Sequence, residues 1–570
     1  MFAQKTISGV VSDAGEPLPG VSIIVKGTSI GGTTDFDGLY SINNLNPKDV
    51  LIFSYLGYKT LELTIGNRTT LNVSMENDAQ QLDDVVVIGY GSASKSDLTA
   101  SVTSVSAKDF DKQPLSRAED ALLGRTSGVQ VIKNSGAPGA DIKVRVRGLN
   151  SINGNNDPLL VVDGVIGGNL SSINTNDIKT FDILKDASAT AIYGSRAANG
   201  VILITTKQGQ VGPAKIDVNY FTSISTVPQT LDLVTPQQFA DIVNTGISNP
   251  DDHISVFGDG VDYQDIYFQS AISNNLQLSA SGKTGKTSFF VSGNYIDQEG
   301  IVFNSDYKRF SLRSNLKADL TDKLTVGLNL YGSREKSFNL ISGGTSSDER
   351  GGITSIVTFN PTLPLRDEDG NFTKSSVYGS LLVNPYAVRH ERFGDLIDNR
   401  FSANLNLSYD FNDNLNFTIL GGGSVSGKSS EVYQGIPAGS NDQQSPTASF
   451  SSRNFSSYQI SNILNWSKEF GEHSVKATGV YEIQELENRN RGFNAADYSI
   501  GGIRDGFNFA ELAEAQSISA DYNSSTLQSY LGRVQYDYNK RLYVTGAIRV
   551  DETSRFRKGN RTGGYFLQDL

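Results

Sequence analysis

Apolar and polar residues alternate along one segment after another from about residue 274 to the end of the chain. In one such segment the apolar positions are Phe401, Ala403, Leu405, Leu407 and Tyr409, and the polar positions between them are Ser402, Asn404, Asn406 and Ser408. A period of two places neighbouring side chains on opposite faces of a β-strand, so the two faces meet different surroundings. Tight turns and long loops alternate between these segments. A long series of such strands is typical of an antiparallel transmembrane β-barrel.

The composition is compatible with a barrel. The 570 residues are 38% hydrophobic with a mean hydropathy of −0.28. No stretch approaches the ~18 apolar residues that a membrane helix needs, but in a barrel only every second residue faces lipid. A net charge of −12 disfavours nucleic acid as a partner, because phosphate binding needs clustered Lys and Arg. The chain has no cysteine, which excludes disulfides and thiolate metal sites.

Eleven segments between residues 211 and 570 fit the barrel pattern. They are 214–226, 274–282, 286–297, 308–320, 322–334, 398–411, 413–426, 456–469, 472–486, 527–538 and 540–552. Long connections are expected at about 335–396, 427–455 and 487–526, on the side that faces outside the cell in a barrel. Thr235-Pro236-Gln237-Gln238, in an earlier connection, predicts a short helix with a capping box. Aromatic residues near strand ends would lie at the lipid–water boundary; these are Tyr295, Tyr409, Trp466, Tyr481, Tyr538 and Tyr543.

Residues 1–76 predict a small β-sandwich, because short apolar strands are separated by frequent Gly, Pro, Asn and Asp turns. Asp35 and Asp37 lie in one of these turns. Their carboxylates either cap backbone amides, which is the commoner role in a turn, or bind calcium.

Residues 77–91 predict a linker with an apolar centre. The β-branched run Val85-Val86-Val87-Ile88 extends readily and can pair with an exposed sheet edge. The run is equally compatible with the first strand of the next domain.

Residues 92–210 predict a mixed α/β domain. Strands are expected at 142–146, 159–162 and 201–204. Helices are expected at 116–123, with Ser116 as N-cap, and at 183–193, where Gly194 would end the helix.

Two parts of the chain resemble known families. The run from Val10 to Tyr40 resembles the carboxypeptidase-regulatory-like (transthyretin-like) domain, which has no catalytic centre of its own. The stretch 147–207 resembles the plug-domain signature of SusC/RagA-type TonB-dependent transporters. The matching positions are Arg147, Gly148, Asp163, Gly164, Tyr193, Gly194, Arg196, Asn199 and Gly200. The order of sandwich (1–76), Ton box linker (77–91), plug (92–210) and barrel (211–570) is similar to that family throughout.

The resemblance implies active import of a bulky nutrient, an oligosaccharide or a peptide, across the outer membrane. TonB, driven by its inner-membrane motor proteins, would capture the Ton box and pull on the plug. The Ton box would be Asp84, Val85, Val86, Val87, Ile88 and Gly89. A SusD-like surface lipoprotein would deliver the substrate, and the signature residues would hold the plug's shape rather than bind substrate. No cofactor, metal or enzymatic activity is implied, and the substrate-contacting residues are not identified.

The sequence contains no convincing catalytic or metal-binding set. The segment 280–287 nearly matches a phosphate-binding loop, but its flanks alternate as strands, whereas such a loop must open a helix. A β-hairpin turn is therefore predicted there. His253, His390 and His473 lack the spacing of metal ligands or of a catalytic triad.

The number of strands sets a further expectation. Eleven candidates fall short of the about twenty-two strands of outer-membrane transporters, although Gly564-Tyr565-Phe566 is similar to the family's mid-barrel motif. We therefore expect this chain to be a fragment or a truncated gene product that does not transport alone. The alternative interpretation is a soluble or surface β-sandwich protein for adhesion or carbohydrate binding, with its apolar stripes buried between two sheets.

Overall fold

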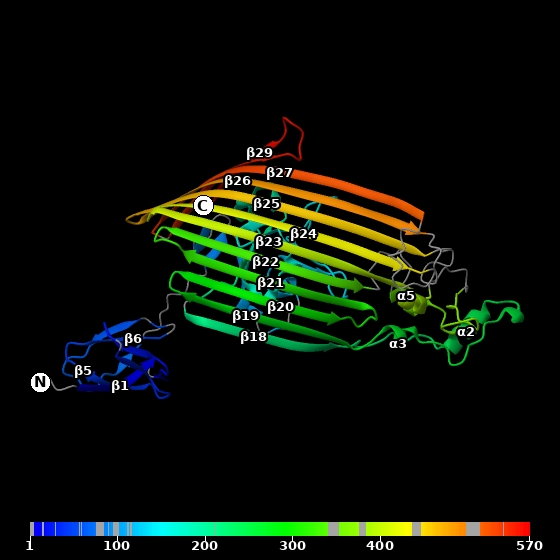
Figure 1. Ribbon diagram of the computed structural model, residues 1–570, viewed down its shortest axis with the longest axis horizontal. Coiled ribbons are helices and arrows are strands. Elements are labelled where there is room, and N and C mark those ends of the chain that lie inside the picture. The colour runs from blue at the N-terminus through cyan, green and yellow to red at the C-terminus, as the bar shows by residue number, and fades with distance from the viewer. Residues whose placement is uncertain are drawn as a thin grey trace. The chain divides into compact units, whose positions relative to one another are not determined.

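The computed structural model describes residues 5–13, 16–28, 30–55, 58, 60–75, 85–88, 91–94, 102–110, 113, 117–210, 212–339, 353–375, 384–435, 446–496, 514–539 and 541–569. The chain divides into two compact units, Met1–Val85 with Ser94–Ser96, and Val86–Ala93 with Asp97–Leu570. Strands dominate both units (Figure 1).

The first unit is a β-sandwich of two four-stranded sheets. One sheet has the order β2-β1-β5 with β8 beside β1, and the other has the order β4-β3-β6-β7. Ile7, Ile23 and Phe53, which come from both sheets, are fully buried in one core. The strands are β1 (Lys5–Asp13), β2 (Glu16–Pro17), β3 (Ser22–Val25), β4 (Gly31–Thr33), β5 (Leu39–Leu45), β6 (Val50–Ser54), β7 (Leu61–Thr64) and β8 (Val73–Ser74).

The turn carboxylate Asp35 caps backbone amides. Its Oδ1 atom accepts hydrogen bonds from the amides of Asp37 at 3.0 Å and Leu39 at 2.8 Å. The favoured interpretation of this turn is thus confirmed for Asp35.

The second unit contains a plug domain ahead of the large sheet. Its main sheet has the order β11-β16-β17-β14-β15, in which β14 and β17 run parallel, and β12 and β13 form a separate hairpin. The strands are β11 (Val102–Ser106), β12 (Val129–Lys133), β13 (Ile142–Val146), β14 (Leu159–Val162), β15 (Val165–Ile166), β16 (Ile178–Leu184) and β17 (Val201–Thr206). The helical turns are η2 (Ala107–Asp109), η3 (Ala118–Leu122), η4 (Leu170–Ser172), η5 (Thr175–Asp177), α1 (Ala187–Thr190) and η6 (Ala191–Ala197).

The predicted strands of the plug are confirmed, but its two predicted helices need correction. Ile183 and Leu184 belong to β16, so the helical turns begin only at Ala187. Gly194 does not end them: it is a kink with φ +63° inside η6, and one more turn follows. The helix expected at 116–123 is the short η3, with Arg117 at its N-cap; Ser116 lies outside the described residues.

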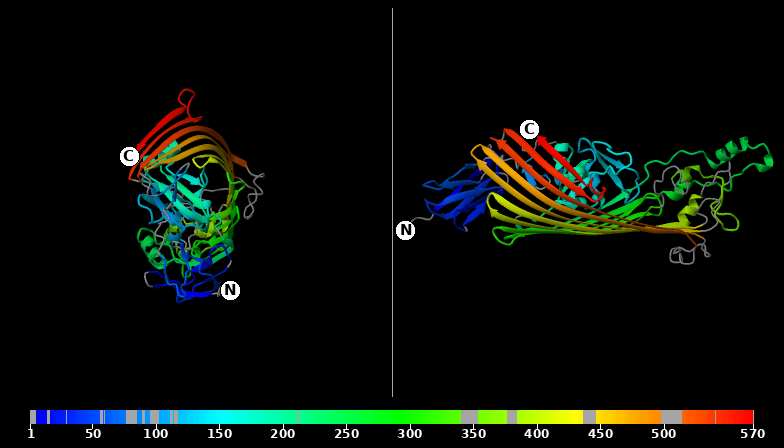
Figure 2. Two further views of the ribbon diagram at one scale, coloured as in Figure 1. Left: turned by 90° about the vertical axis from the view of Figure 1, so that its left-hand side faces the viewer. Right: turned by 90° about the horizontal axis from the view of Figure 1, so that it is seen from above.

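A twelve-stranded antiparallel sheet follows the plug, with β18 to β29 in chain order. The sheet curves around the plug, as the left view of Figure 2 shows. The strands are β18 (Gly212–Ser225), β19 (Ala271–Thr284), β20 (Thr287–Glu299), β21 (Ser305–Asp319), β22 (Leu324–Asn339), β23 (Arg392–Asn412), β24 (Leu415–Gln434), β25 (Thr447–Phe470), β26 (His473–Ala496), β27 (Glu514–Tyr538), β28 (Leu542–Thr553) and β29 (Thr562–Asp569). The segment 280–287 forms the predicted hairpin turn, with Gly285 at φ +58°.

Three predictions about this sheet were wrong. The strand β29 was not predicted, and the loops expected at 427–455 and 487–526 are largely strand, because β24 extends to Gln434 and β25 starts at Thr447. Likewise, β26 extends to Ala496 and β27 starts at Glu514. Many of the extra residues are polar on both faces, as in the run 426–431, so these parts show no regular alternation. Backbone pairing extends the strands there, well beyond the ~10 residues that a bilayer requires.

Among the described residues, four α-helices and the 3-10 helix η7 (Pro250–Asp252) lie in the connections at the long-loop end of the sheet. The α-helices are α2 (Pro236–Thr245), α3 (Tyr263–Tyr267), α4 (Ile353–Thr358) and α5 (Pro385–Glu391). The capping box at the start of α2 is confirmed, since Thr235 and Gln238 exchange side-chain to backbone hydrogen bonds. Tyr267, Ile356 and Val388 join α3, α4 and α5 in one apolar cluster.

Within the described ranges, no helix is both long and apolar enough to cross a membrane.

Burial on the large sheet is the reverse of that in a soluble protein. On β21, Phe310 and Leu312 are 50% and 53% exposed on one face, whereas Arg309, Ser311 and Arg313 on the other face are at most 5% exposed. The polar face is the concave one, because Arg309 donates a hydrogen bond to the plug residue Ser171 and Arg313 forms an ion pair with Asp163 of the plug. A soluble sandwich would bury the apolar rows instead, so the alternative interpretation is wrong for this sheet.

Candidate functional site

The candidate functional site is the interface between the plug and the concave face of the sheet. Arg196 of η6 reaches the inner wall, where its Nη2 lies 2.7 Å from Glu482 Oε1 and its Nη1 donates to Gln484 Oε1 at 2.7 Å. Glu482 is fully buried, and its other oxygen accepts from Gln459 and Ser461 at 3.0 Å each. A charge-assisted pair with satisfied neighbours therefore joins the plug to β26.

A second contact lies at Gly194, next to the buried pair of Arg549 and Asp551 on β28. Arg549 Nε donates to Asp551 Oδ1 at 2.7 Å, and Arg549 Nη1 donates to the carbonyl of Ile192. A Cβ atom on Gly194 would lie 2.1 Å from Asp551 Oδ2. The backbone of η6 thus touches the wall where only glycine fits. Tyr193, beside it, is buried in an apolar core shared by plug and wall.

Asp163 and Asp177 of the plug flank the inward-facing Arg313. Arg313 lies 3.7 Å from Asp163 Oδ2 and 3.6 Å from Asp177 Oδ2. Thr206 donates to Asp163 through its amide at 3.0 Å and its hydroxyl at 2.8 Å, and Gly164 follows with φ +87°. The buried charge of Arg313 is thus compensated by a carboxylate on either side.

The remaining signature residues stabilise the plug internally. Arg147 forms an ion pair with Asp186, and Gly148 follows it with φ +98°. Asn199 accepts a hydrogen bond from Asn150 Nδ2 at 3.0 Å, and a Cβ on Gly200 would meet the Val146 side chain at 2.8 Å. The signature therefore divides into two sets: Arg147, Gly148, Asn199 and Gly200 contact the plug itself, whereas Asp163, Gly164, Tyr193, Gly194 and Arg196 contact the wall.

The segment expected to be the Ton box forms a short strand. Val85–Ile88 is β9, which pairs with β10 (Gly91–Ser94) in a two-stranded sheet. Asp84 and Gly89 lie outside the described residues.

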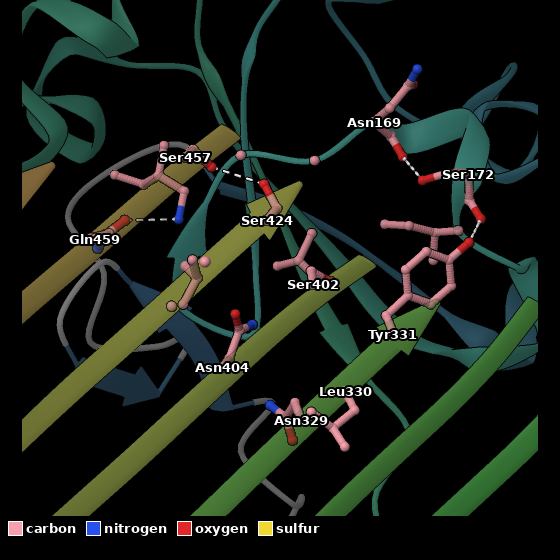
Figure 3. A pocket seen from close by; sticks show the side chains of 18 of the residues that line it. Asn169, Ser172, Asn329, Leu330, Tyr331, Ser402, Asn404, Ser424, Ser457 and Gln459 are labelled. Carbon is pink, nitrogen blue, oxygen red and sulfur yellow. Dashed lines mark hydrogen bonds between the residues drawn. The ribbon is translucent and has the colours of Figure 1, made fainter. Parts of the chain in front are cut away.

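Several cavities lie between the plug and the sheet, and two of them are beside the loop 165–173. A small one of about 60 Å³ lies behind the loop 165–173 (Figure 3), where Gln459 Oε1 accepts from the amide of Ile166 at 3.1 Å and the hydroxyl of Tyr331 donates to the carbonyl of Ser172. A larger one of about 740 Å³ opens beside it. Its wall residues include Lys428 and Arg453, which lie toward the long-loop ends of β24 and β25.

Burial shifts the protonation of two plug residues. It raises the pKa of Glu119, which lines the larger cavity, to about 7, although Arg117 nearby favours the charged form. Burial also lowers the pKa of Lys185, whose ammonium group donates to Thr103 Oγ1 at 2.6 Å. In the part of the chain that the structure describes, no group of three or more His, Asp or Glu residues could hold a metal ion.

The wall partners of the plug were not predicted from sequence. They include Gln459, Glu482, Gln484, Arg549, Asp551, Arg309 and Arg313. One signal was present: charged residues such as Arg309 and Arg313 stand at the polar positions of an apolar/polar alternation. The sequence does not show which plug residue each would meet.

Comparisons with known proteins agree with this arrangement. Residues 94–201 match the TonB-dependent Receptor Plug Domain family, and residues 7–87 match the CarboxypepD_reg-like domain family. The chain is 36% identical to TonB-dependent receptor P3 of Formosa agariphila over 98% of this chain and 55% of that protein. It is 30% identical to TonB-dependent receptor SusC of Bacteroides thetaiotaomicron over 99% of this chain and 58% of that protein. Over almost its whole length the chain is thus similar to TonB-dependent receptors, SusC among them.

Solved structures show the same fold. The RagAB peptide importer in the "open-open" state superposes with a TM-score of 0.73 at 23% identity, over 85% of this chain and 58% of that chain. The unliganded ferric citrate transporter FecA superposes with a TM-score of 0.52 at 12% identity, over 83% of this chain and 60% of that chain. The plug and the twelve-stranded sheet of this chain thus have the fold of the corresponding parts of these transporters.

The chain spans about half the length of the curated relatives it matches. Those relatives are named as receptors rather than enzymes, which fits the expectation of a non-enzymatic protein.

Proposed function

We propose that this chain supplies the plug and part of the wall of an active importer that carries a bulky nutrient, an oligosaccharide or a peptide, across the outer membrane. The reversed burial of the large sheet carries this proposal, because a wall that is apolar outside and polar inside encloses a hydrophilic path through lipid. The plug fills that path and must move before cargo can pass.

Movement of the plug would be driven through the Ton box, proposed as Asp84, Val85, Val86, Val87, Ile88 and Gly89. The short β9 strand supports this role, since an extended segment binds a partner by strand addition. TonB with its motor proteins would supply the force. A SusD-like surface lipoprotein would deliver cargo at the long-loop end, as the resemblance to SusC/RagA-type transporters implies.

The plug signature would act at two places. The plug-internal set would keep the domain folded under load, while the wall-facing set, above all Arg196 and Gly194, would fix the closed position. The proposed domain limits are 1–76, 77–91, 92–210 and 211–570.

The test is deletion of 84–89 in cells that express the chain together with TonB and any polypeptide that completes the barrel. We expect cargo uptake to fall to background while the protein still reaches the outer membrane, and an isolated 84–89 peptide to bind the periplasmic domain of TonB. Uptake that survives the deletion would overturn the proposed route of energy transfer. Replacement of the exposed loop residue Phe257 by Ser is the control.

A further inference from the structure

A row of charged residues crosses five neighbouring strands of the wall. In the register of the sheet, Arg309 of β21 is opposite Glu335 of β22, and Glu335 is opposite Asp398 of β23. Asp398 is opposite Lys428 of β24, and Lys428 is opposite Arg453 of β25. Directly opposite residues on paired strands share a face. We call these five residues the charged row.

The charged row lies on the concave face and changes sign along its length. The plug covers its first part, where Arg309 Nη1 donates to the carbonyl of Ser171 at 2.9 Å. Asp398, Lys428 and Arg453 line the larger cavity. The cavity therefore has a carboxylate on one side and two cations on the next two strands.

The acidic side of the cavity contains unsatisfied acceptors. Glu119 of the plug and Asp398 of the wall are 2% and 4% exposed, and both line the cavity. Glu119 Oε2 and Asp398 Oδ1 have no hydrogen-bond partner among the described residues, although Asp398 Oδ2 accepts from Arg400 at 2.5 Å. A buried acceptor without a partner is costly, so these atoms favour a ligand that brings donors.

The basic side is open to a ligand as well. In the described part of the chain Lys428 has no ion-pair or hydrogen-bond partner, and Arg453 is exposed with Nε bonded to Asn490 at 2.9 Å. In all, the lining contains four acidic residues (Glu119, Asp141, Asp157, Asp398) and four basic residues (Lys143, Arg400, Lys428, Arg453).

Aromatic surface on which a neutral sugar could stack is scarce in this lining. Of its three aromatic residues, Phe401 is on the outward face and 52% exposed, and Tyr331 is 8% exposed and engaged with Arg313 and Ser172. Among the lining residues, only Phe455 is left as an aromatic side chain on which a sugar could stack.

We propose that this cavity binds a zwitterionic oligomer, one that carries ammonium and carboxylate groups on the same chain, as a short peptide does. Its ammonium group would lie at Glu119 and Asp398, and its carboxylate at Lys428 and Arg453. A neutral oligosaccharide would displace water from these charges without compensating them, whereas a zwitterion compensates both sides. The inference rests on the proposed function in that the bound oligomer is the cargo.

The test measures binding to the purified full chain in detergent, which requires neither TonB nor transport. The probes are a library of hexapeptides with free termini, the same library N-acetylated, the same library with C-terminal amides, and a mixture of maltooligosaccharides. Retained ligand is measured by mass spectrometry. We expect retention of the free library and a loss of about tenfold in affinity on acetylation or amidation.

The Lys428→Gln variant should bind the free and amidated libraries equally, while Lys286→Gln, which removes an exposed turn lysine, should behave as the original chain. Retention of maltooligosaccharides in preference to peptides, or an unchanged response of Lys428→Gln to amidation, would overturn the inference. Failure of uptake with binding intact would count only against the proposed importer, so the two failures are distinguishable.

Discussion

Gly194 occupies a position where both backbone conformation and available space exclude a side chain. Its φ of +63° with ψ of −150° is a region that L-residues rarely adopt. In addition, a Cβ atom there would lie 2.1 Å from Asp551 and 2.8 Å from Arg549. A single residue thus sets how closely the plug approaches β28.

We predict that Gly194→Ala loosens the plug more than backbone strain alone can explain. Strain at such a conformation costs on the order of 1–3 kcal/mol, and the collision with the buried pair adds to it. The measurement is limited proteolysis of the plug together with urea unfolding followed by fluorescence of Trp466, the chain's one tryptophan.

The matched control is Gly285→Ala, which has φ +58° but no other atom within 4 Å of the added Cβ. Equal effects of the two substitutions would show that contact with the wall contributes nothing at Gly194.

At the scale of elements, η6 is attached to β26 by one buried ion pair. Arg196 has a side-chain exposure of 15% and Glu482 of 0%. Removing one member of a buried pair leaves an uncompensated charge and costs about 3–5 kcal/mol, whereas removing both costs much less.

We therefore predict that the destabilising effects of Arg196→Gln and Glu482→Gln are strongly non-additive in a double-mutant cycle. Each single variant should expose the plug to protease, and the double variant should recover part of the protection. Calorimetry of the purified chain in detergent checks the same cycle as a change in unfolding temperature. Additive effects would mean that the two side chains are not coupled, and the exposed pair Lys286 and Asp322 supplies a cycle expected to be near zero.

An element could be predicted from sequence only where its two faces have different surroundings and therefore different residue types. Strands such as β21 were identified because lipid on one face and the plug on the other impose alternation. The outer parts of β24 to β27 have polar residues on both faces at many positions, so Ser429 and Ser430 carried no such signal. Ile183 and Leu184 looked helical because both faces of β16 are buried in the plug, which makes a short strand and a helix alike in composition.

The candidate site was predictable only on the plug side. The family signature located Gly194 and Arg196 in the sequence, but their partners Asp551 and Glu482 lie almost 300 residues or more further along the chain. Pairing over that distance is set by the register of twelve strands, which alternation alone does not specify.

At the scale of the whole molecule, the reversed burial of the sheet predicts where charge is tolerated. Leu312→Arg places a cation on the lipid face in mid-strand and should cost about 2–4 kcal/mol in membrane stability. Phe257→Arg, in an exposed loop at 63% exposure, should cost nothing measurable. Folding of the full chain into lipid vesicles, followed by a denaturant titration, checks both; equal tolerance of the two would contradict a lipid-facing β21.

The strands of the wall lengthen from 13 residues in β20 to 25 in β27. At a rise of about 3.3 Å per residue, the longer strands extend further at the long-loop end than β20 does, and their extension there is a largely polar sheet. A ligand much longer than the larger cavity could then contact this extended sheet while its free end stays in solvent. The wall would thus bind one end of the ligand without limiting the ligand's total length.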